Sequence, residues 1–169
     1  MQNTERKKAM EFAQKAHANH MYDHFPYFKH LQDVVNVLIR FGYTDPDLLD
    51  AGWCHDTMED AGKSYSDIKK ELGIEVAEIV YCVTDEKGRN RKEKKEKTLP
   101  GIRANPDAII IKLADRIANC EHSNVYAGDD KNFLDMYRKE YKLFRWALFV
   151  PGHAVEMWNT LDALMNYNP

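Results

Sequence analysis

The segment HDTMED, residues 55–60, gathers four ionisable side chains in six positions. His55 and Asp56 place an imidazole nitrogen beside a carboxylate oxygen, a pair that suits a borderline divalent metal such as manganese, iron or zinc. Glu59 and Asp60 follow closely enough to reach a water molecule at such a metal without being ligands themselves. A single His-Asp pair is weak evidence, however, because it also arises by chance as a helix cap or a surface pair.

A second group of polar residues interrupts the apolar run AIIIKLADRIANC, residues 108–120. Lys112, Asp115, Arg116 and Asn119 recur at i, i+3, i+4 and i+7, so they form one polar stripe on an otherwise apolar helix. Burying a lone carboxylate costs several kcal/mol, so Asp115 should face a cation. That cation is either a neighbouring lysine or arginine or a bound metal, and the spacing alone leaves both alternatives open.

His30 completes a wider pattern, because it lies at the head of another apolar run, which begins at Phe28. His30, then His55 with Asp56, then Asp115 give the order H, HD, D in three separate helical contexts. This constellation is much less common than the dipeptide and favours a metal site.

The elements that must position these residues are expected to be helices, because apolar residues recur at helical spacing. The helix over residues 28–39 can end at Gly42, and Asp45 with Pro46 gives the next helix an N-cap and a first residue. The apolar face of the helix over 28–39 consists of Leu31, Val34, Val35, Leu38 and Ile39.

Further helices are predicted along the rest of the chain, and no alternating strand pattern is longer than AIII. Ser64 and Asp67 resemble a capping box, and Gly73 closes the short helix that follows. The other predicted helices span residues 4–19, residues 75–83, residues 108–120, and two segments that follow the turn-like sequences NVYAGDD and VPGH. Trp53, Trp146 and Trp158 are expected in the core. The predicted fold is an all-α bundle.

Composition narrows the class of protein. With 169 residues and 44% hydrophobic content, the chain can form one compact domain without disulfide or metal crosslinks. A net charge of −3 argues against duplex nucleic acid as a partner. The three cysteines are odd in number and widely spaced, and no segment resembles a signal peptide or a membrane span. We therefore expect a cytoplasmic protein that is not bound to a membrane.

Four motifs occur in the order of a known family: PYFKH (26–30), LLDAGWCHDTMED (48–60), LGIEVAEIVYCVTDEKG (72–88) and IIIKLADRIAN (109–119). With them the chain resembles the HD-domain metal phosphohydrolases. It resembles most closely the hydrolase domain of the RelA/SpoT family and its stand-alone small alarmone hydrolases. The resemblance implies a single HD-type helical domain over residues 1–169. Its motif-bearing core spans about 9–123, and a helical extension covers about 124–169.

The resemblance also implies roles for the acidic and histidine residues. His30, His55, Asp56 and Asp115 match four ligands of one divalent metal, usually manganese in this family. Glu59 and Asp60 match the family's acidic catalytic pair, which positions and deprotonates the attacking water. The implied reaction is hydrolysis of a phosphate ester or diphosphate.

Substrate contacts depart from the family pattern at several positions. Ala118 and His122 replace the family's histidine and its phosphate-contacting threonine after KLADR. The arginine that stacks on guanine in the family is replaced, and Met21 and Tyr22 occupy that stretch. Tyrosine can also stack on a base. The other candidates are on or near the polar stripe and in the extension: Lys112, Asn119, His122 and Arg138.

Three functions follow from these residues. The leading one is hydrolysis of the 3′-diphosphate of guanosine tetra- or pentaphosphate, (p)ppGpp, to GDP or GTP and pyrophosphate. The second keeps the metal chemistry but acts on a nucleoside monophosphate or the 2′-phosphate of NADPH. The third is a non-enzymatic helical module that binds a nucleotide.

Two other groups are interpreted without a catalytic role. His17, His20 and His24 lack an acidic residue at the spacing of known zinc helices, so pocket lining or surface is favoured over a second metal site. The basic run over residues 87–97 contains interleaved glutamates and is interpreted as solvated. A contact between this run and a polyphosphate is the alternative.

Overall fold

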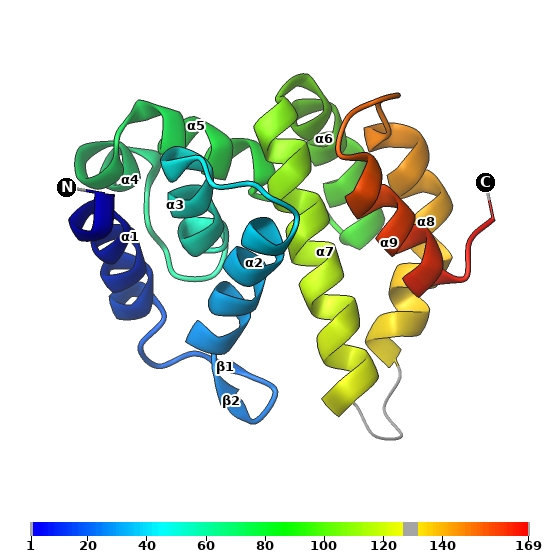
Figure 1. The fold of residues 1–169 in the computed structure, drawn as a ribbon, viewed down its shortest axis with the longest axis horizontal. Coiled ribbons are helices and arrows are strands. Elements are labelled where there is room, and N and C mark those ends of the chain that lie inside the picture. The colour runs from blue at the N-terminus through cyan, green and yellow to red at the C-terminus, as the bar shows by residue number, and fades with distance from the viewer. Residues whose placement is uncertain (1, 127–131, 169) are drawn as a thin grey trace.

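A computed structural model of the chain describes residues 2–126 and 132–168. Within these residues the chain forms nine helices and one short hairpin (Figure 1). The helices are α1 Gln2–Ala16, α2 Phe28–Arg40, α3 Pro46–Cys54, α4 Tyr65–Leu72, α5 Ile74–Val83, α6 Arg91–Ala104, α7 Pro106–Tyr126, α8 Asn132–Leu148 and α9 Val155–Met165. The hairpin pairs β1 Met21–Tyr22 with β2 Phe25–Pro26. No helix in the described part of the chain is long and apolar enough to cross a membrane.

Local signals in the sequence define several helix ends. The Asp45 side chain accepts hydrogen bonds from the first backbone N–H groups of α3, and Ser64 and Asp67 form the predicted capping box of α4. Gly42 follows α2 with a φ of 81°, and Gly73 separates α4 from α5 with a φ of 101°. Glycine adopts these positive values without strain. These predicted boundaries are confirmed.

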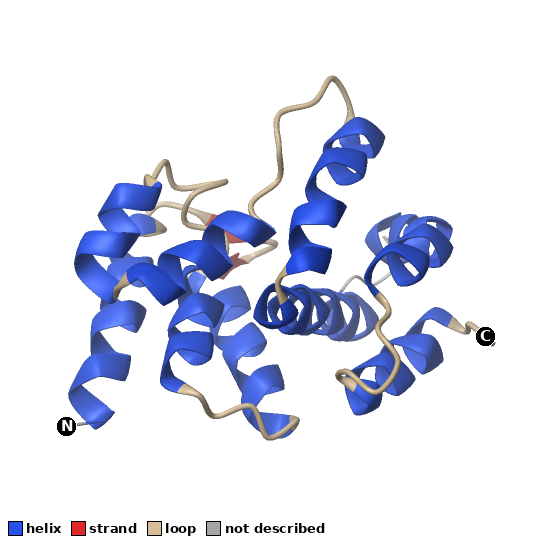
Figure 2. Cartoon of the chain, turned by 90° about the horizontal axis from the view of Figure 1, so that it is seen from above, coloured by secondary structure: helices blue, strands red, loops and turns tan. Residues whose placement is uncertain are grey.

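Helix α7 is the central element of the bundle (Figures 1 and 2). It contacts α2, α3, α5, α6, α8 and α9. In Figure 1, α1 to α5 lie on one side of it, and α8 and α9 lie on the other. Because α7 is covered on most sides, its apolar residues are buried: Ile109, Ile111, Leu113 and Ile117 are each at most 1% exposed. The prediction of one buried helix through AIII and KLADRIANC is confirmed.

Five details differ from the sequence-based prediction. Helix α6 was not among the predicted helices. The first helix ends at Ala16 instead of Asn19, and the hairpin was not predicted because its strands have only two residues each. Helix α7 continues through residues 124–126 of the turn-like NVYAGDD; its residues 127–130 lie outside the described part. Ile39 is 48% exposed, at the edge of the apolar face of α2.

Trp146 contradicts the expectation that all three tryptophans are in the core. Trp158 is 1% exposed and Trp53 is 9% exposed, but Trp146 is 83% exposed. The buried residues of α8 are Leu134, Tyr141, Phe144 and Leu148. Trp146 lies two residues from Phe144, which places it on the opposite face of the helix.

Candidate active site

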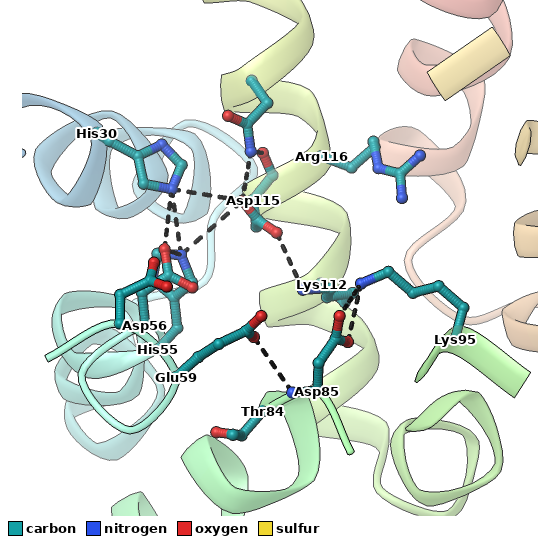
Figure 3. A network of polar contacts seen from close by, with 12 residues as sticks. His30, His55, Asp56, Glu59, Thr84, Asp85, Lys95, Lys112, Asp115 and Arg116 are labelled. Carbon is teal, nitrogen blue, oxygen red and sulfur yellow. Dashed lines mark hydrogen bonds and ion pairs between the residues drawn. The ribbon is translucent and has the colours of Figure 1, made fainter. Parts of the chain in front are cut away.

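Three segments bring the H, HD, D residues together at one end of the α2–α7 contact (Figure 3). His30 is in the first turn of α2, His55 and Asp56 follow α3 directly, and Asp115 lies in the middle of α7. The Nε2 atoms of His30 and His55 are 3.2 Å apart. Asp56 Oδ2 lies 3.0 Å from the His55 Nε2 atom, and Asp115 Oδ1 lies 3.4 Å from the His30 Nε2 atom. We call these four side chains the HHDD cluster.

The HHDD cluster fits a divalent metal. His55 Nδ1 lies 2.9 Å from the carbonyl oxygen of Gly52. A carbonyl can only accept, so Nδ1 carries the proton, and Nε2 presents its lone pair to the cluster. Candidate ligand atoms of His30, His55 and Asp56 all lie within 4.8 Å of one another. Two imidazoles and nearby carboxylates form a donor set typical of manganese, iron or zinc.

The two carboxylates of the cluster, Asp56 and Asp115, favour a positive charge between them. Burial would raise the pKa of Asp115, but Lys112, whose Nζ is 3.2 Å from Asp115 Oδ2, and the two histidines hold that pKa well below its usual range. Burial lowers the pKa of His30, but hydrogen bonding to Asp115 and Asp56 outweighs it and raises the pKa to about 9. Asp115 therefore pairs with a lysine, the first of the two alternatives, and it also faces the histidines. Its role as a metal ligand stays a prediction.

Glu59 and Asp60 line a cavity of about 190 Å³ together with three members of the HHDD cluster, His30, Asp56 and Asp115. Glu59 Oε2 accepts a hydrogen bond from the backbone N–H of Asp85 at 3.2 Å. Partial burial and the Asp85 charge raise the pKa of Glu59. Partial burial and the Asp56 charge raise the pKa of Asp60. Both carboxylates are thus better proton acceptors than ordinary surface carboxylates.

Tyr27 joins the cluster to this acidic pair, a contact that sequence reasoning missed. Its hydroxyl lies 2.7 Å from Asp56 Oδ2 and 3.1 Å from Asp60 Oδ2. Behind it, the His17 ring is buried and stacks on the Tyr27 ring with centroids 4.5 Å apart. The available signal was the position of Tyr27 within PYFKH, one helical turn before His30.

The wall opposite Glu59 carries basic residues from α6 and α7. Arg91 and Lys95 line the cavity together with Lys112 and Arg116. Arg91 is nevertheless 42% exposed, so the solvated interpretation of residues 87–97 is wrong for Lys95, whose side chain is 15% exposed, but not for Arg91. It holds for Arg89 and Lys92, whose side chains are 90% and 80% exposed. The i, i+4 spacing of Arg91 and Lys95 could have indicated a common face, but only their packing beside α7 shows which face meets the cavity.

A second cavity, of about 390 Å³, adjoins the first and is mainly aromatic. Tyr22, Asn119 and Tyr137 line both cavities. The Tyr22 hydroxyl donates a hydrogen bond of 2.7 Å to Asn119 Oδ1, and the Tyr22 ring lies 4.4 Å from the His122 ring. The hairpin and α7 thus bring three of the predicted substrate-binding residues together, and the fourth, Lys112, lines the first cavity.

Arg138 lies apart from the other predicted substrate-binding residues. It lines neither of the two cavities. Its guanidinium lies 3.4 Å from Asp135 Oδ1, and it borders a separate hollow beside α9 that includes Asn124 and Asn159. His24 is also exposed, with Nδ1 3.0 Å from the Asp23 carboxylate.

Comparisons with known proteins agree with this geometry. A family model described as an HD domain matches residues 9–138. The guanosine-3′,5′-bis(diphosphate) 3′-pyrophosphohydrolase MESH1 of Danio rerio is 29% identical over 122 residues, which are 69% of this chain and 68% of that protein. MESH1 of Xenopus tropicalis is 31% identical over 124 residues, 72% of this chain and 67% of that protein. The alignments to MESH1 of Drosophila melanogaster and Mus musculus cover 54% and 56% of those proteins.

A solved structure, described as a metazoan ortholog of SpoT that hydrolyses ppGpp, superposes with a TM-score of 0.80. Sequence identity is 25%, and the match covers 96% of this chain and 94% of that one. The predicted all-α, HD-type fold and the family resemblance are confirmed. The chain belongs to the HD-domain family.

Proposed function

We propose that this protein is a metal-dependent nucleotide phosphohydrolase that removes the 3′-diphosphate of (p)ppGpp. The products are GDP or GTP and pyrophosphate. The observation that carries the proposal is the convergence of the HHDD cluster with Glu59 and Asp60 at one cavity. The similarity to hydrolases of guanosine-3′,5′-bis(diphosphate) supports the choice of substrate.

His30, His55, Asp56 and Asp115 would hold one divalent ion, which we expect to be Mn²⁺. When bound, such an ion acts as a Lewis acid toward a phosphoryl oxygen and makes water more acidic. Glu59 and Asp60 accept the proton of the attacking water, for which their raised pKa values suit them. The Tyr27 hydroxyl orients the Asp60 carboxylate.

In the proposed reaction, the water oxygen bonds to the phosphorus next to the ribose, and the bond from that phosphorus to the ribose 3′ oxygen breaks. The proton taken by the acidic pair is returned to the 3′ oxygen. Lys112 balances the charge of Asp115, and Tyr22, Asn119 and His122 face the nucleoside from the aromatic cavity.

The test is an assay of purified protein with Mn²⁺ and ppGpp, followed by nucleotide separation and pyrophosphate detection. We expect GDP and pyrophosphate in equal amounts. A nucleoside monophosphate and NADPH, assayed in parallel for released phosphate, test the other phosphatase activities. If neither GDP nor pyrophosphate is formed from ppGpp, the proposed substrate is wrong.

Asp60→Asn should lower turnover about 100-fold or more, because the proton acceptor is removed, while metal binding persists. Asp107→Asn, an exposed carboxylate at the start of α7, is the matched control and should be as active as the wild type. If the wild type and Asp60→Asn both hydrolyse no faster than the uncatalysed rate, while Asp115→Ala loses the metal, a non-enzymatic nucleotide-binding module is favoured instead.

A further inference from the structure

Arg116 is a buried cation without a close anionic partner. Its side chain is 4% exposed, and its Nη2 atom is 3.9 Å from Glu140 Oε2, too far for a hydrogen bond. Its Nη1 atom is buried and makes no hydrogen bond to any residue that the structure describes. A buried guanidinium with an unused donor is unfavourable by several kcal/mol unless another anion binds it.

The surroundings of Arg116 hold its guanidinium in one place. The guanidinium carbon lies 4.1 Å from the centroid of the Tyr137 ring and 4.5 Å from that of Phe144. Both rings are on α8, so this helix positions the planar group by cation–π contact. A rigid guanidinium presents two parallel donors, which match the oxygens of a phosphate.

Arg116 is also the least neutralised of the four cations that line the first cavity. Lys95 contacts both oxygens of Asp85, at 2.8 and 2.7 Å. Lys112 Nζ lies 3.2 Å from Asp115, and Arg91 contacts both oxygens of Glu140, at 2.6 and 3.1 Å. Among the described cations of this wall, only Arg116 has its nearest carboxylate beyond hydrogen-bonding distance.

Figure 3 shows the Arg116 side chain extending from α7 on the side away from His30. It therefore does not join the HHDD cluster, although Asp115 and Arg116 are adjacent in sequence. We therefore expect a phosphate bound by Arg116 to be a different group from the one whose bond breaks at the cluster.

We propose that Arg116 is a phosphate-binding residue that holds a second phosphate of the substrate. The identity of the nucleotide rests on the proposed function; the anion site rests on Arg116 and its surroundings. For ppGpp, the second phosphate is either the outer phosphate of the 3′-diphosphate or part of the 5′-diphosphate. In both cases the bound group is a phosphate oxyanion. After hydrolysis the 3′ phosphates are in pyrophosphate and the 5′-diphosphate is in GDP, so the two possibilities can be tested with separate probes.

The experiment is isothermal titration of the Mn²⁺-loaded protein with inorganic pyrophosphate and, separately, with GDP. Arg116→Met keeps the packing on Tyr137 and Phe144 but removes the charge, so affinity for one of the two probes should fall about 10- to 100-fold. Arg116→Lys should lose less affinity, because lysine keeps the positive charge but lacks the two parallel donors of the guanidinium. A loss of affinity for pyrophosphate shows that Arg116 holds the outer phosphate of the 3′-diphosphate. A loss of affinity for GDP shows that it holds the 5′-diphosphate.

Arg103→Met is the control, since Arg103 is an exposed arginine at the end of α6. It should change neither affinity more than about twofold, as expected for an exposed charge. Arg116→Met should melt at or above the wild-type temperature, because an unpaired buried charge is removed. Unchanged affinity for both probes, or a wild type that binds neither at millimolar concentration, would overturn the proposal.

The two proposals can fail separately. If the wild type does not hydrolyse ppGpp but its affinity for a diphosphate depends on Arg116, the proposed phosphate site is supported and the proposed substrate is wrong. If the wild type hydrolyses ppGpp and Arg116→Met has the same KM and the same product affinities, the proposed substrate is supported and the phosphate site is wrong.

Discussion

Glu59 shows at the scale of one residue how the fold prepares a carboxylate to accept a proton. It keeps contact with solvent and lines the cavity, while surrounding protein atoms and the neighbouring Asp85 carboxylate raise its pKa. The backbone N–H of Asp85 works in the opposite direction by bonding to the Glu59 carboxylate. Asp85 therefore holds the Glu59 side chain in place and also increases its basicity.

Asp85→Asn should shift the acid limb of the activity profile to lower pH. The proposed base acts as its anion, so activity is lost as pH falls through its pKa. The Asp85 charge raises that pKa, and the substitution would remove the charge but keep the backbone N–H. The check is turnover against pH with saturating Mn²⁺, and Asp107→Asn is the control. If the acid limb moves to higher pH in Asp85→Asn, the Asp85 charge does not raise the pKa of the proposed base.

At the scale of elements, Gly52 links helix packing to the geometry of the HHDD cluster. A Cβ atom at this position of α3 would lie 2.8 Å from Leu38 Cδ1 and 3.3 Å from Val35 Cγ2, both on α2. The Gly52 carbonyl also accepts the His55 Nδ1 hydrogen bond. The close approach of α2 and α3 therefore brings His30 and His55 together.

Gly52→Ala should lower the free energy of unfolding by about 1 to 3 kcal/mol, because the added methyl group overlaps Leu38 Cδ1, and the fully buried Leu38 side chain or α3 must shift to relieve the overlap. The same shift should weaken Mn²⁺ binding. Gly101→Ala is the matched control, because a Cβ there meets open space within α6. It should be neutral or stabilise by about 0.5 to 1 kcal/mol. Urea unfolding and metal titration measure both effects, and equal behaviour of the two variants would refute the packing argument.

At the scale of the whole molecule, the HHDD cluster connects parts of the chain that are far apart in sequence. His30 on α2, the residues after α3, and Asp115 on α7 all contribute to it. The candidate ligand atoms are close together only in the folded state, so a metal bound there would stabilise the fold against unfolding.

Chelation should therefore lower the melting temperature, and Mn²⁺ should raise it with concentration. At 100 times its Kd, a ligand specific to the folded state contributes about 2.7 kcal/mol. Asp115→Ala should abolish the dependence on Mn²⁺. The measurement is a thermal melt across a Mn²⁺ series, with Asp107→Asn as the control. A melting temperature that does not respond to Mn²⁺ in the wild type would argue against metal binding by the folded chain.

The sequence by itself determined several helix boundaries, and it predicted the residues of the HHDD cluster and the acidic pair, which the fold brings close together. Asp45, Ser64 and Gly42 act through contacts within a few residues, so their effect can be predicted locally. The His and Asp residues could be identified because they occur in motifs with a family order. The expectation that Trp146 is in the core was wrong, although its phase relative to Tyr141 and Phe144 along α8 could have indicated its exposure.

Only the tertiary structure decided which other side chains share the cavity. Tyr27 bridges Asp56 and Asp60, and Arg116 stacks on rings from α8, through contacts between segments distant in sequence. Arg91 and Lys95 look like part of a solvated basic run until α6 packs beside α7. The sequence can indicate a charge and its helical face, but the direction of that face depends on packing that buries apolar residues throughout the chain.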